Sequence, residues 1–262
     1  MKCYLINLDR SPERLKRMST LFAGMEVAFI RVSAVDGKKL TQREIDGWLA
    51  GEGNFYHLGP GEVGCFLSHR KCWEFIAEGE DSHSAIFEDD LHFGAGLKDV
   101  LVTADWIPND ADIVKLETTL TRTLYQRRQA ATIAGRTVRR LHSSQFGSGG
   151  YIISRPCAKK LVEESKKIAD PVDQFIFNNN LSMALSLKIY HLVPAICIQD
   201  LILSQNRFKN YNIGSELSGE RPKLQETLRR KILREIQRPI KRISIRLKAS
   251  LGGMEWKKIP IE

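Results

Sequence analysis

The sequence of 262 residues has no long hydrophobic run, since no window approaches the roughly 18 to 20 uncharged apolar residues that a membrane-spanning helix needs. A transmembrane helix is therefore excluded. Residues 1–10 contain too short an apolar stretch, and charges too early, for a secretory signal. We therefore expect a cytoplasmic protein, and the length fits one large domain or one domain with an appendage.

Cysteine is scarce, and no two of the five residues form a C-x-x-C pair. Their number is odd, their spacing is irregular and several lie within apolar runs, which is typical of reduced thiols in a core. Neither a disulfide framework nor a zinc site is expected. The five are Cys3, Cys65, Cys72, Cys157 and Cys197.

Two common catalytic motifs are missing. The Gly-rich segment 146–154 is not followed by Gly-Lys-Ser or Gly-Lys-Thr, so it is not a P-loop, and its glycines instead predict close approach of backbone to a ligand. Ser68 and His69 are adjacent, but neighbours on a helix point about 100° apart, so they are not a nucleophile pair. A buried, hydrogen-bonded side chain is the default interpretation of His69, and ligand contact is the alternative.

Charge is unevenly distributed along the chain. Residues 1–220 carry 27 basic and 27 acidic side chains, whereas residues 221–262 carry thirteen Lys or Arg and four Asp or Glu, which accounts for the net charge of +9. Apolar residues recur there about every four positions, which predicts a basic amphipathic helix on an anionic membrane surface. A helix packed on a partner subunit is the open alternative, and the lack of interleaved aromatics argues against nucleic acid. The apolar positions are Leu224, Leu228, Ile232, Ile236, Ile240, Ile243, Leu247 and Leu251.

The order of the predicted elements indicates an α/β fold. Strands over 3–8 and 27–35 flank a helix that starts after Ser11 and Pro12, which is a βαβ unit of a parallel sheet. The capping box of Thr41 and Glu44 predicts another short helix. We expect a catalytic domain over residues 1–215 and a tail over 216–262. Further strands are expected at 112–117 and 190–198, helices at 63–76, 156–168 and from about 170, and loops or short excursions near the mouth of the site at 118–142.

The most informative stretch is 84–91, where a short apolar strand ends in three acids, Glu88, Asp89 and Asp90. If the chain stays extended, Glu88 and Asp90 point to one side and Asp89 to the other. A metal site at the carboxyl edge of an α/β sheet is one explanation, and a solvated acidic turn is the other.

The turn after the first strand carries one amide side chain, one carboxylate and two arginines. Helix amides and arginines together suit a phosphate-bearing ligand, although a solvated surface turn is equally compatible with this segment alone. The residues are Asn7, Asp9, Arg10 and Arg14.

Taken in order, several segments resemble glycosyltransferase family 25, the lipooligosaccharide-type transferases related to the collagen β-galactosyltransferases. The resemblance covers about residues 3–205, and the basic tail lies outside it. Gly149 and Gly150 before Tyr151 depart from the expected pattern. The matching segments are 6–14, 34–37, 61–69, 87–90, 150–154 and 171–175.

The resemblance implies a GT-A-type, Rossmann-like fold, a UDP-sugar donor (often UDP-galactose), a divalent metal (manganese or magnesium) and an inverting reaction. By position, Glu88 and Asp90 would hold the metal and Asp89 would contact the nucleotide. The nucleotide pocket would be completed by Asn7, Asp9, Arg10, Arg14, Asp36, Gly37 and Ser68.

An inverting transfer also needs a carboxylate base on the acceptor side. Asp173 is the first choice because it lies in a matching segment far from the acidic triplet, and Glu117 and Asp200 are the alternatives. The expected acceptor is a saccharide on a lipid-anchored core, which places the enzyme at the inner face of the inner membrane. The rival functions are a metal-dependent nucleotide phosphohydrolase and a non-catalytic membrane or nucleic-acid binder that acts through the tail.

Overall fold

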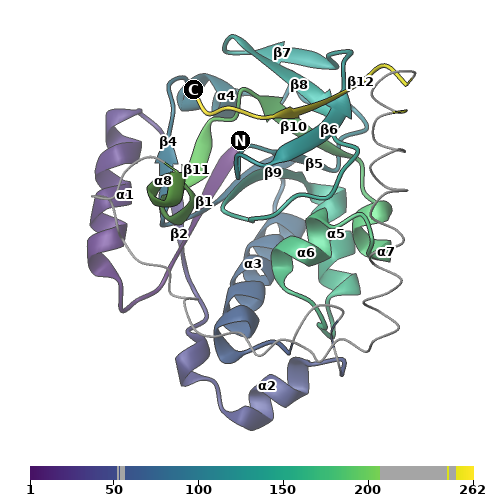
Figure 1. The fold of residues 1–262 in the computed structure, drawn as a ribbon. Coiled ribbons are helices and arrows are strands. Elements are labelled where there is room, and N and C mark those ends of the chain that lie inside the picture. The colour runs from purple at the N-terminus through teal and green to yellow at the C-terminus, as the bar shows by residue number, and fades with distance from the viewer. Residues whose placement is uncertain (52, 54–56, 207–246, 248–251) are drawn as a thin grey trace.

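A computed structural model describes residues 1–51, 53, 57–206, 247 and 252–262. The chain is built around an eight-stranded sheet with the order β2-β1-β3-β9-β5-β10-β8-β7 (Figure 1). Two further pairs, β11 with β4 and β12 with β6, stand beside it. The sheet strands are β1 (Lys2–Asn7), β2 (Ile30–Ser33), β3 (His83–Glu88), β5 (Ile113–Lys115), β7 (Ala131–Ile133), β8 (Arg136–Arg140), β9 (Gly150–Ser154) and β10 (Ile189–Val193). The paired strands are β4 (Leu91–Phe93), β6 (Arg122–Gln126), β11 (Cys197–Gln199) and β12 (Met254–Lys258).

Most strands of the sheet run in one direction. β1 is parallel to β2 and β3, and β5 is parallel to β10, while β9 runs antiparallel between β3 and β5. β8 also runs against its neighbours β10 and β7. The predicted α/β class with a mostly parallel sheet is confirmed.

The predicted βαβ unit is present as β1, α1 and β2. α1 begins at Pro12, a residue that suits the first helical position, although the Ser11 side chain makes no capping hydrogen bond. β2 is shorter than the predicted strand over 27–35. The capping box of Thr41 and Glu44 starts α2, as predicted. The helices are α1 (Pro12–Gly24), α2 (Gln42–Trp48), α3 (Pro60–Glu78), α4 (Leu97–Val102), α5 (Arg155–Glu164), α6 (Val172–Phe177), α7 (Ser182–Leu185) and α8 (Asp200–Asn206).

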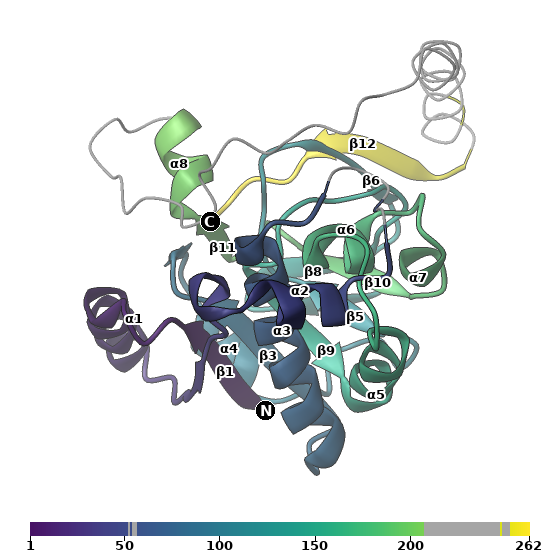
Figure 2. The same cartoon turned by 90° about the horizontal axis from the view of Figure 1, so that it is seen from below.

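Helices cover both faces of the sheet. α3 lies across β3 and β9 (Figure 2), and with α5 and α6 it buries one core around Phe66 and Trp73. α1 and α4 bury the other core around Phe22. Along β3 the side chains alternate between these cores, with Ile86 in the first and Phe87 in the second, as a strand of period two requires. The strand that carries the acidic triplet is therefore fixed from both sides.

Two predictions about secondary structure are wrong. Residues 118–142 were expected to form loops or short excursions, yet they contain β6, β7 and β8. These strands have few apolar residues because they lie at or beyond the sheet edge, where only part of each strand is buried. The predicted strand over 190–198 is two strands, β10 and β11, which are separated at Pro194, a residue without an N–H for a ladder hydrogen bond.

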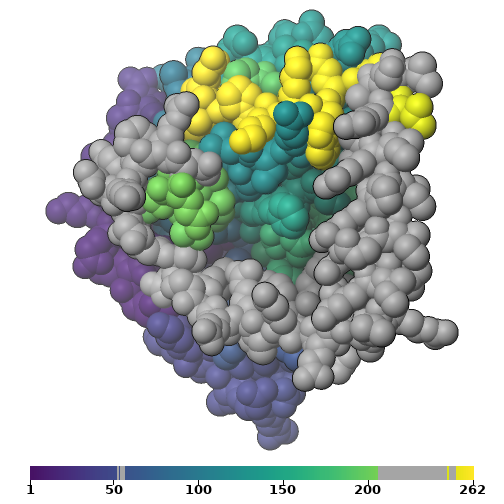
Figure 3. Space-filling model, in the orientation of Figure 1, coloured from purple at the N-terminus to yellow at the C-terminus, as the bar shows by residue number. Residues whose placement is uncertain are grey.

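The last residues of the chain pack against this body. β12 pairs antiparallel with β6, and Ile259 is buried beside Tyr125 and Ala195. Figure 3 shows residues 252–262, in yellow, at the surface beside the teal strands. The predicted amphipathic helix lies outside the described residues apart from Leu247, and so does the predicted boundary between residues 215 and 216. None of the helices described is both long and apolar enough to cross a bilayer.

We expect Ile259→Ala to lower the free energy of unfolding by about 2–4 kcal/mol, because it empties a buried aliphatic site. Lys258→Ala, on the exposed part of β12, is the matched control and should change stability by less than about 0.5 kcal/mol. Urea unfolding of both variants measures the difference. Equal stabilities would show that residues 252–262 add nothing to the folded body.

Candidate active site

The carboxyl ends of β1, β2 and β3 lie side by side, and a cavity of about 360 Å³ opens there. Segments far apart in sequence meet in its lining, because parallel strands deliver their following loops to the same edge of the sheet. The lining includes Asn7, Arg10, Arg14, Asp36, Gly37, Ser68, His69, Glu88, Asp89 and Asp90.

A second cavity of about 740 Å³ adjoins the first. Its own lining comes from the Gly-rich segment before β9, from the start of α6 and from the residues after α6, and it includes Phe146, Ser148, Asp173, Gln174, Asn178 and Asn180. The two cavities share Cys65, Glu88, Asp90 and Gln199. The acidic triplet therefore lies at their junction.

Glu88 is held by three hydrogen-bond donors. Nε2 of His69 lies 3.0 Å from Oε1, Oγ of Ser148 lies 2.9 Å from the same oxygen, and Nε2 of Gln199 lies 3.2 Å from Oε2. Burial opposes ionisation of Glu88, but the His69 and Ser148 hydrogen bonds and the charge of Lys115 outweigh it and lower the pKa of this carboxyl. These contacts fix the orientation of the Glu88 carboxyl and favour its ionised form.

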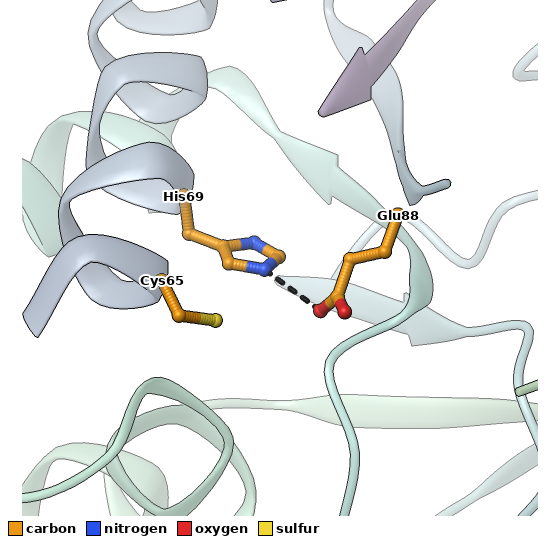
Figure 4. Close-up of side chains that lie close together, drawn as sticks. All are labelled: Cys65, His69 and Glu88. Carbon is orange, nitrogen blue, oxygen red and sulfur yellow. Dashed lines mark hydrogen bonds and ion pairs between the residues drawn. The ribbon is translucent and has the colours of Figure 1, made fainter. Parts of the chain in front are cut away.

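His69 belongs to a buried chain of hydrogen bonds. The indole Nε1 of Trp73 donates to the Tyr151 hydroxyl over 2.8 Å, and that hydroxyl lies 3.0 Å from Nδ1 of His69. Burial raises the pKa of Tyr151, so its hydroxyl keeps the proton that it can donate to Nδ1. Nε2–H of His69 is then directed at Glu88 (Figure 4). The prediction of a buried, hydrogen-bonded histidine is confirmed, and the ring also lines the first cavity.

Asp89 and Asp90 do not continue the strand. β3 ends at Glu88, and the two aspartates lie in a turn before β4, so the extended triplet considered from the sequence is wrong. The side chains nevertheless separate: Asp89 accepts hydrogen bonds from Asn7 over 2.7 Å and from Arg14 over 3.1 Å. Burial raises the pKa of Asp89 even so.

Asp90 is the uncompensated member of the triplet. Its Oδ1 is buried and has no hydrogen-bond partner among the described residues. Burial, and then the neighbouring charges of Glu88, Asp89 and Glu117, raise the pKa of Asp90 well above its usual range. An orphaned carboxylate oxygen close to a second carboxylate, at the junction of two cavities, fits a hard cation with oxygen ligands.

Sequence comparison shows which family the chain belongs to. The sequence profile of glycosyltransferase family 25, described as LPS biosynthesis proteins, matches residues 1–176. The chain belongs to this family. The resemblance expected from the motifs is thus confirmed, and the protein is a glycosyltransferase of lipopolysaccharide or lipooligosaccharide biosynthesis.

Curated relatives agree with this assignment. The chain is 32% identical over 210 residues to the lipooligosaccharide biosynthesis protein lex-1 of Haemophilus influenzae, covering 76% of this chain and 67% of the relative. It is 26% identical over 230 residues to the lacto-N-neotetraose biosynthesis glycosyltransferase LgtB of Neisseria gonorrhoeae, covering 84% and 82%.

Solved structures show weaker similarity. An active-site mutant of LgtC aligns over 62% of this chain and 59% of its own, with 13% identity and a TM-score of 0.33. The inositol-1-phosphate CTP transferase from T. maritima aligns over 76% and 88%, with 12% identity and a TM-score of 0.39. At these TM-scores neither structure adds to the family assignment.

Most of the residues predicted to bind the nucleotide line the first cavity of the transferase. Arg10 donates to Asp36 over 2.9 Å, and the Ser68 hydroxyl accepts from the Val35 amide over 2.8 Å. A Cβ on Gly37 would lie 1.9 Å from the Pro60 carbonyl oxygen, so only glycine fits there. Asp9 is not in this lining: it is exposed and accepts hydrogen bonds from Arg31 and Ser33.

Of the three predicted bases, Asp173 is the one that lines either of the two cavities. It lies in the second cavity, where it accepts hydrogen bonds from the backbone amides of Gly147 over 3.1 Å and Gln174 over 2.8 Å. Glu117 is fully buried against Lys115 at 3.1 Å, and Asp200 accepts a hydrogen bond from His92 over 2.7 Å. Neither of these two is in the lining of either cavity.

Three residues close to Glu88 were missed by sequence reasoning, namely Cys65, Ser148 and Gln199. Ser148 stands in the Gly-rich segment and Gln199 ends an apolar run, but neither signal indicates contact with Glu88. Cys65 lies in a matching family segment, yet it was counted among the core thiols.

We expect substitutions of Asp90 and Glu88 to have opposite effects on stability. In metal-free buffer at pH 7, Asp90→Asn should raise the free energy of unfolding by about 1 kcal/mol or more, because it removes a charge whose folded-state pKa is raised. The gain should disappear below the ordinary Asp pKa of about 3.9, where the wild-type side chain is protonated in both states.

Glu88→Gln is the matched comparison for this test. The lowered pKa of Glu88 stabilises the fold above the ordinary Glu pKa of about 4.3, and that contribution is lost as the pH falls. Glu88→Gln should therefore lower stability at pH 7 by about 1–3 kcal/mol. Urea unfolding from pH 3 to 8 measures both variants, and a destabilised Asp90→Asn protein at pH 7 contradicts the assignment.

Proposed function

We propose that this transferase moves a hexose, with galactose as the first candidate, from a UDP-sugar to a hydroxyl of a lipooligosaccharide or lipopolysaccharide core. The reaction inverts the anomeric centre, requires manganese or magnesium and takes place on a GT-A-type fold. The observation that carries this proposal is the meeting of two cavities at Glu88 and Asp90. The first cavity is lined by the residues predicted to bind the nucleotide, and the second contains Asp173.

The first cavity has the chemistry of a nucleotide-sugar site. Arg10 and Arg14 bring positive charge to its wall, and guanidinium groups bind phosphate oxygens strongly. Asp36 is fixed by Arg10 and by the amide of Lys38, and it offers carboxylate oxygens that can accept hydrogen bonds from sugar hydroxyls. The volume is within the usual range for small-molecule sites, about 300–1,000 Å³.

The metal would be held by Glu88 and Asp90, whose oxygens suit Mn²⁺ or Mg²⁺. When bound, such a cation neutralises the charge that develops on the departing diphosphate. The orphaned Oδ1 of Asp90 is the feature of the free protein that such a cation would satisfy.

The second cavity suits a saccharide acceptor. Amide side chains of Gln174, Asn178 and Asn180 can hydrogen-bond to hydroxyls, and the half-exposed ring of Phe146 offers an apolar surface to a sugar face. Asp173 would take the proton of the acceptor hydroxyl. As that oxygen bonds to the anomeric carbon, the bond from this carbon to the UDP oxygen breaks, and UDP leaves into the first cavity.

Two variants, Asp173→Asn and Asp90→Asn, should distinguish donor binding from the chemical step. With Mn²⁺, UDP-galactose or UDP-glucose should raise the melting temperature of the wild type and of Asp173→Asn, but not of Asp90→Asn. Asp173→Asn should lower kcat roughly 100- to 10,000-fold, because the base is lost while the donor site is intact. Thermal scans and a radiolabelled-sugar transfer assay measure these effects, with the exposed Asp105→Asn as the control.

Two results would contradict the proposal. The first is the absence of a melting shift with any combination of UDP-, GDP- or CMP-sugar and divalent metal. The second is nucleotide hydrolysis that needs no acceptor and survives Asp173→Asn, which would support a phosphohydrolase.

We also propose that the basic segment 221–251 holds the enzyme on the anionic inner face of the inner membrane, where a lipid-anchored acceptor lies. Replacing the Lys and Arg residues of this segment by Gln, with residues 252–262 left in place, should abolish binding to anionic vesicles. Each basic residue near such a surface contributes about 1 kcal/mol. Vesicle flotation measures the loss, and activity on a soluble acceptor should persist. Unchanged flotation of the neutral variant would overturn this location.

A further inference from the structure

Cys65, His69 and Glu88 lie close enough together to share one metal ion. One ligand atom of each residue lies within 4.8 Å of the ligand atoms of the other two. Figure 4 shows the thiol and the imidazole projecting from the same side of α3 and the carboxylate facing them from the end of β3. The irregular spacing of the cysteines in the sequence gave no reason to expect such a group.

The fold explains this convergence. Cys65 and His69 are four residues apart on α3, so their side chains lie on one face of the helix, one turn apart. α3 lies across β3, and Glu88 is the last residue of that strand. Two residues of a buried helix and the last residue of a strand therefore place three ligand atoms close together.

The set of donors indicates which metal fits. A thiolate, an imidazole and a carboxylate are ligands that zinc accepts together, whereas Mg²⁺ and Mn²⁺ prefer oxygen. Three protein ligands with a fourth position open is the arrangement of accessible zinc sites. Cys65 and Glu88 line both cavities, so the open position would face their junction.

The surroundings already orient these ligands. A metal-binding histidine usually has its second ring nitrogen hydrogen-bonded, and here Tyr151 lies 3.0 Å from Nδ1 of His69. Ser148 and Gln199 hold the Glu88 carboxylate. Nε2 of His69 and Oε1 of Glu88, now joined by a hydrogen bond of 3.0 Å, point at the same small volume as the thiol.

We propose that Cys65, His69 and Glu88 form a zinc site distinct in its ligands from the Glu88–Asp90 pair. On binding, the Cys65 thiol releases its proton to solvent as the sulfur–zinc bond forms. The Nε2 proton of His69 also leaves to solvent while Nδ1 takes one up, so the ring stays neutral and Nδ1–H then donates to the Tyr151 hydroxyl oxygen. The consequence for activity rests on the proposed function. Because Glu88 belongs to both sets, zinc removes it from the oxygen site and inhibits the transferase in competition with Mn²⁺.

Cobalt tests the site without any activity assay. The full chain, freed of metal, is titrated with Co²⁺, which gives a near-ultraviolet charge-transfer band only when a thiolate is a ligand. The wild type and Cys72→Ala should show the band, and Cys65→Ala should not. Cys72 is the matched control because it is a buried cysteine on the same helix. Absence of the band in the folded wild type, or its persistence in Cys65→Ala, overturns the proposal.

A second measurement needs no variant. Cys65 is the partly exposed cysteine, and the other four are buried. Zn²⁺ should therefore protect Cys65 from alkylation in the wild type, with the modified peptide identified by mass spectrometry. Unchanged labelling of Cys65 at saturating Zn²⁺ counts against the site even if Cys65→Ala does not fold.

The two proposals can fail separately. A cobalt band together with zinc inhibition that Mn²⁺ relieves supports both. A cobalt band in a transferase that zinc does not inhibit supports the zinc site and contradicts the assigned role of Glu88. As a further check, Tyr151→Phe should weaken Zn²⁺ binding roughly 10- to 100-fold by freeing the His69 ring.

Discussion

The arrangement of charge around the acidic triplet is the constraint on which the site depends. Three carboxylates follow one another where the sheet ends, and each has a different environment. Glu88 receives three hydrogen bonds and Asp89 receives two, whereas Oδ1 of Asp90 has none among the described residues. Among the three carboxylates of the triplet, Asp90 is therefore the one with an unsatisfied buried oxygen among the described residues, which costs stability in the free protein and suits the proposed cation.

The same hydrogen bonds also hold the site together. Asp89 joins the end of β3 to the turn after β1, and Glu88 joins it to α3, to the segment before β9 and to β11. Each of these hydrogen bonds connects a different segment of the cavity lining to the end of β3. A substitution at Glu88 therefore alters both cavities at once, whereas one at Asp173 changes the second cavity alone.

The sequence predicted the features that depend on local patterns. The βαβ unit follows from the Ser11–Pro12 signal and from hydrophobic periodicity, and the triplet stands out because a buried strand rarely ends in three acids. It did not predict β6 and β8, whose apolar residues are few. The partner of β6, β12, and one of the two partners of β8, β10, lie far along the chain. Ser148 and Gln199 were missed for the same reason, since their contact with Glu88 exists only once β9 and β11 are in place.

The two proposed sets of metal ligands share Glu88, so the choice of metal is expected to depend on whether the sugar donor is bound. With a nucleotide diphosphate in the first cavity, phosphate oxygens would join Glu88 and Asp90, and an all-oxygen set favours Mn²⁺ or Mg²⁺. Without the donor, the thiol of Cys65 and the imidazole of His69 are still close to Glu88, and this set of donors favours zinc. Bound donor and bound zinc should therefore exclude each other, because each requires the carboxylate that the other uses.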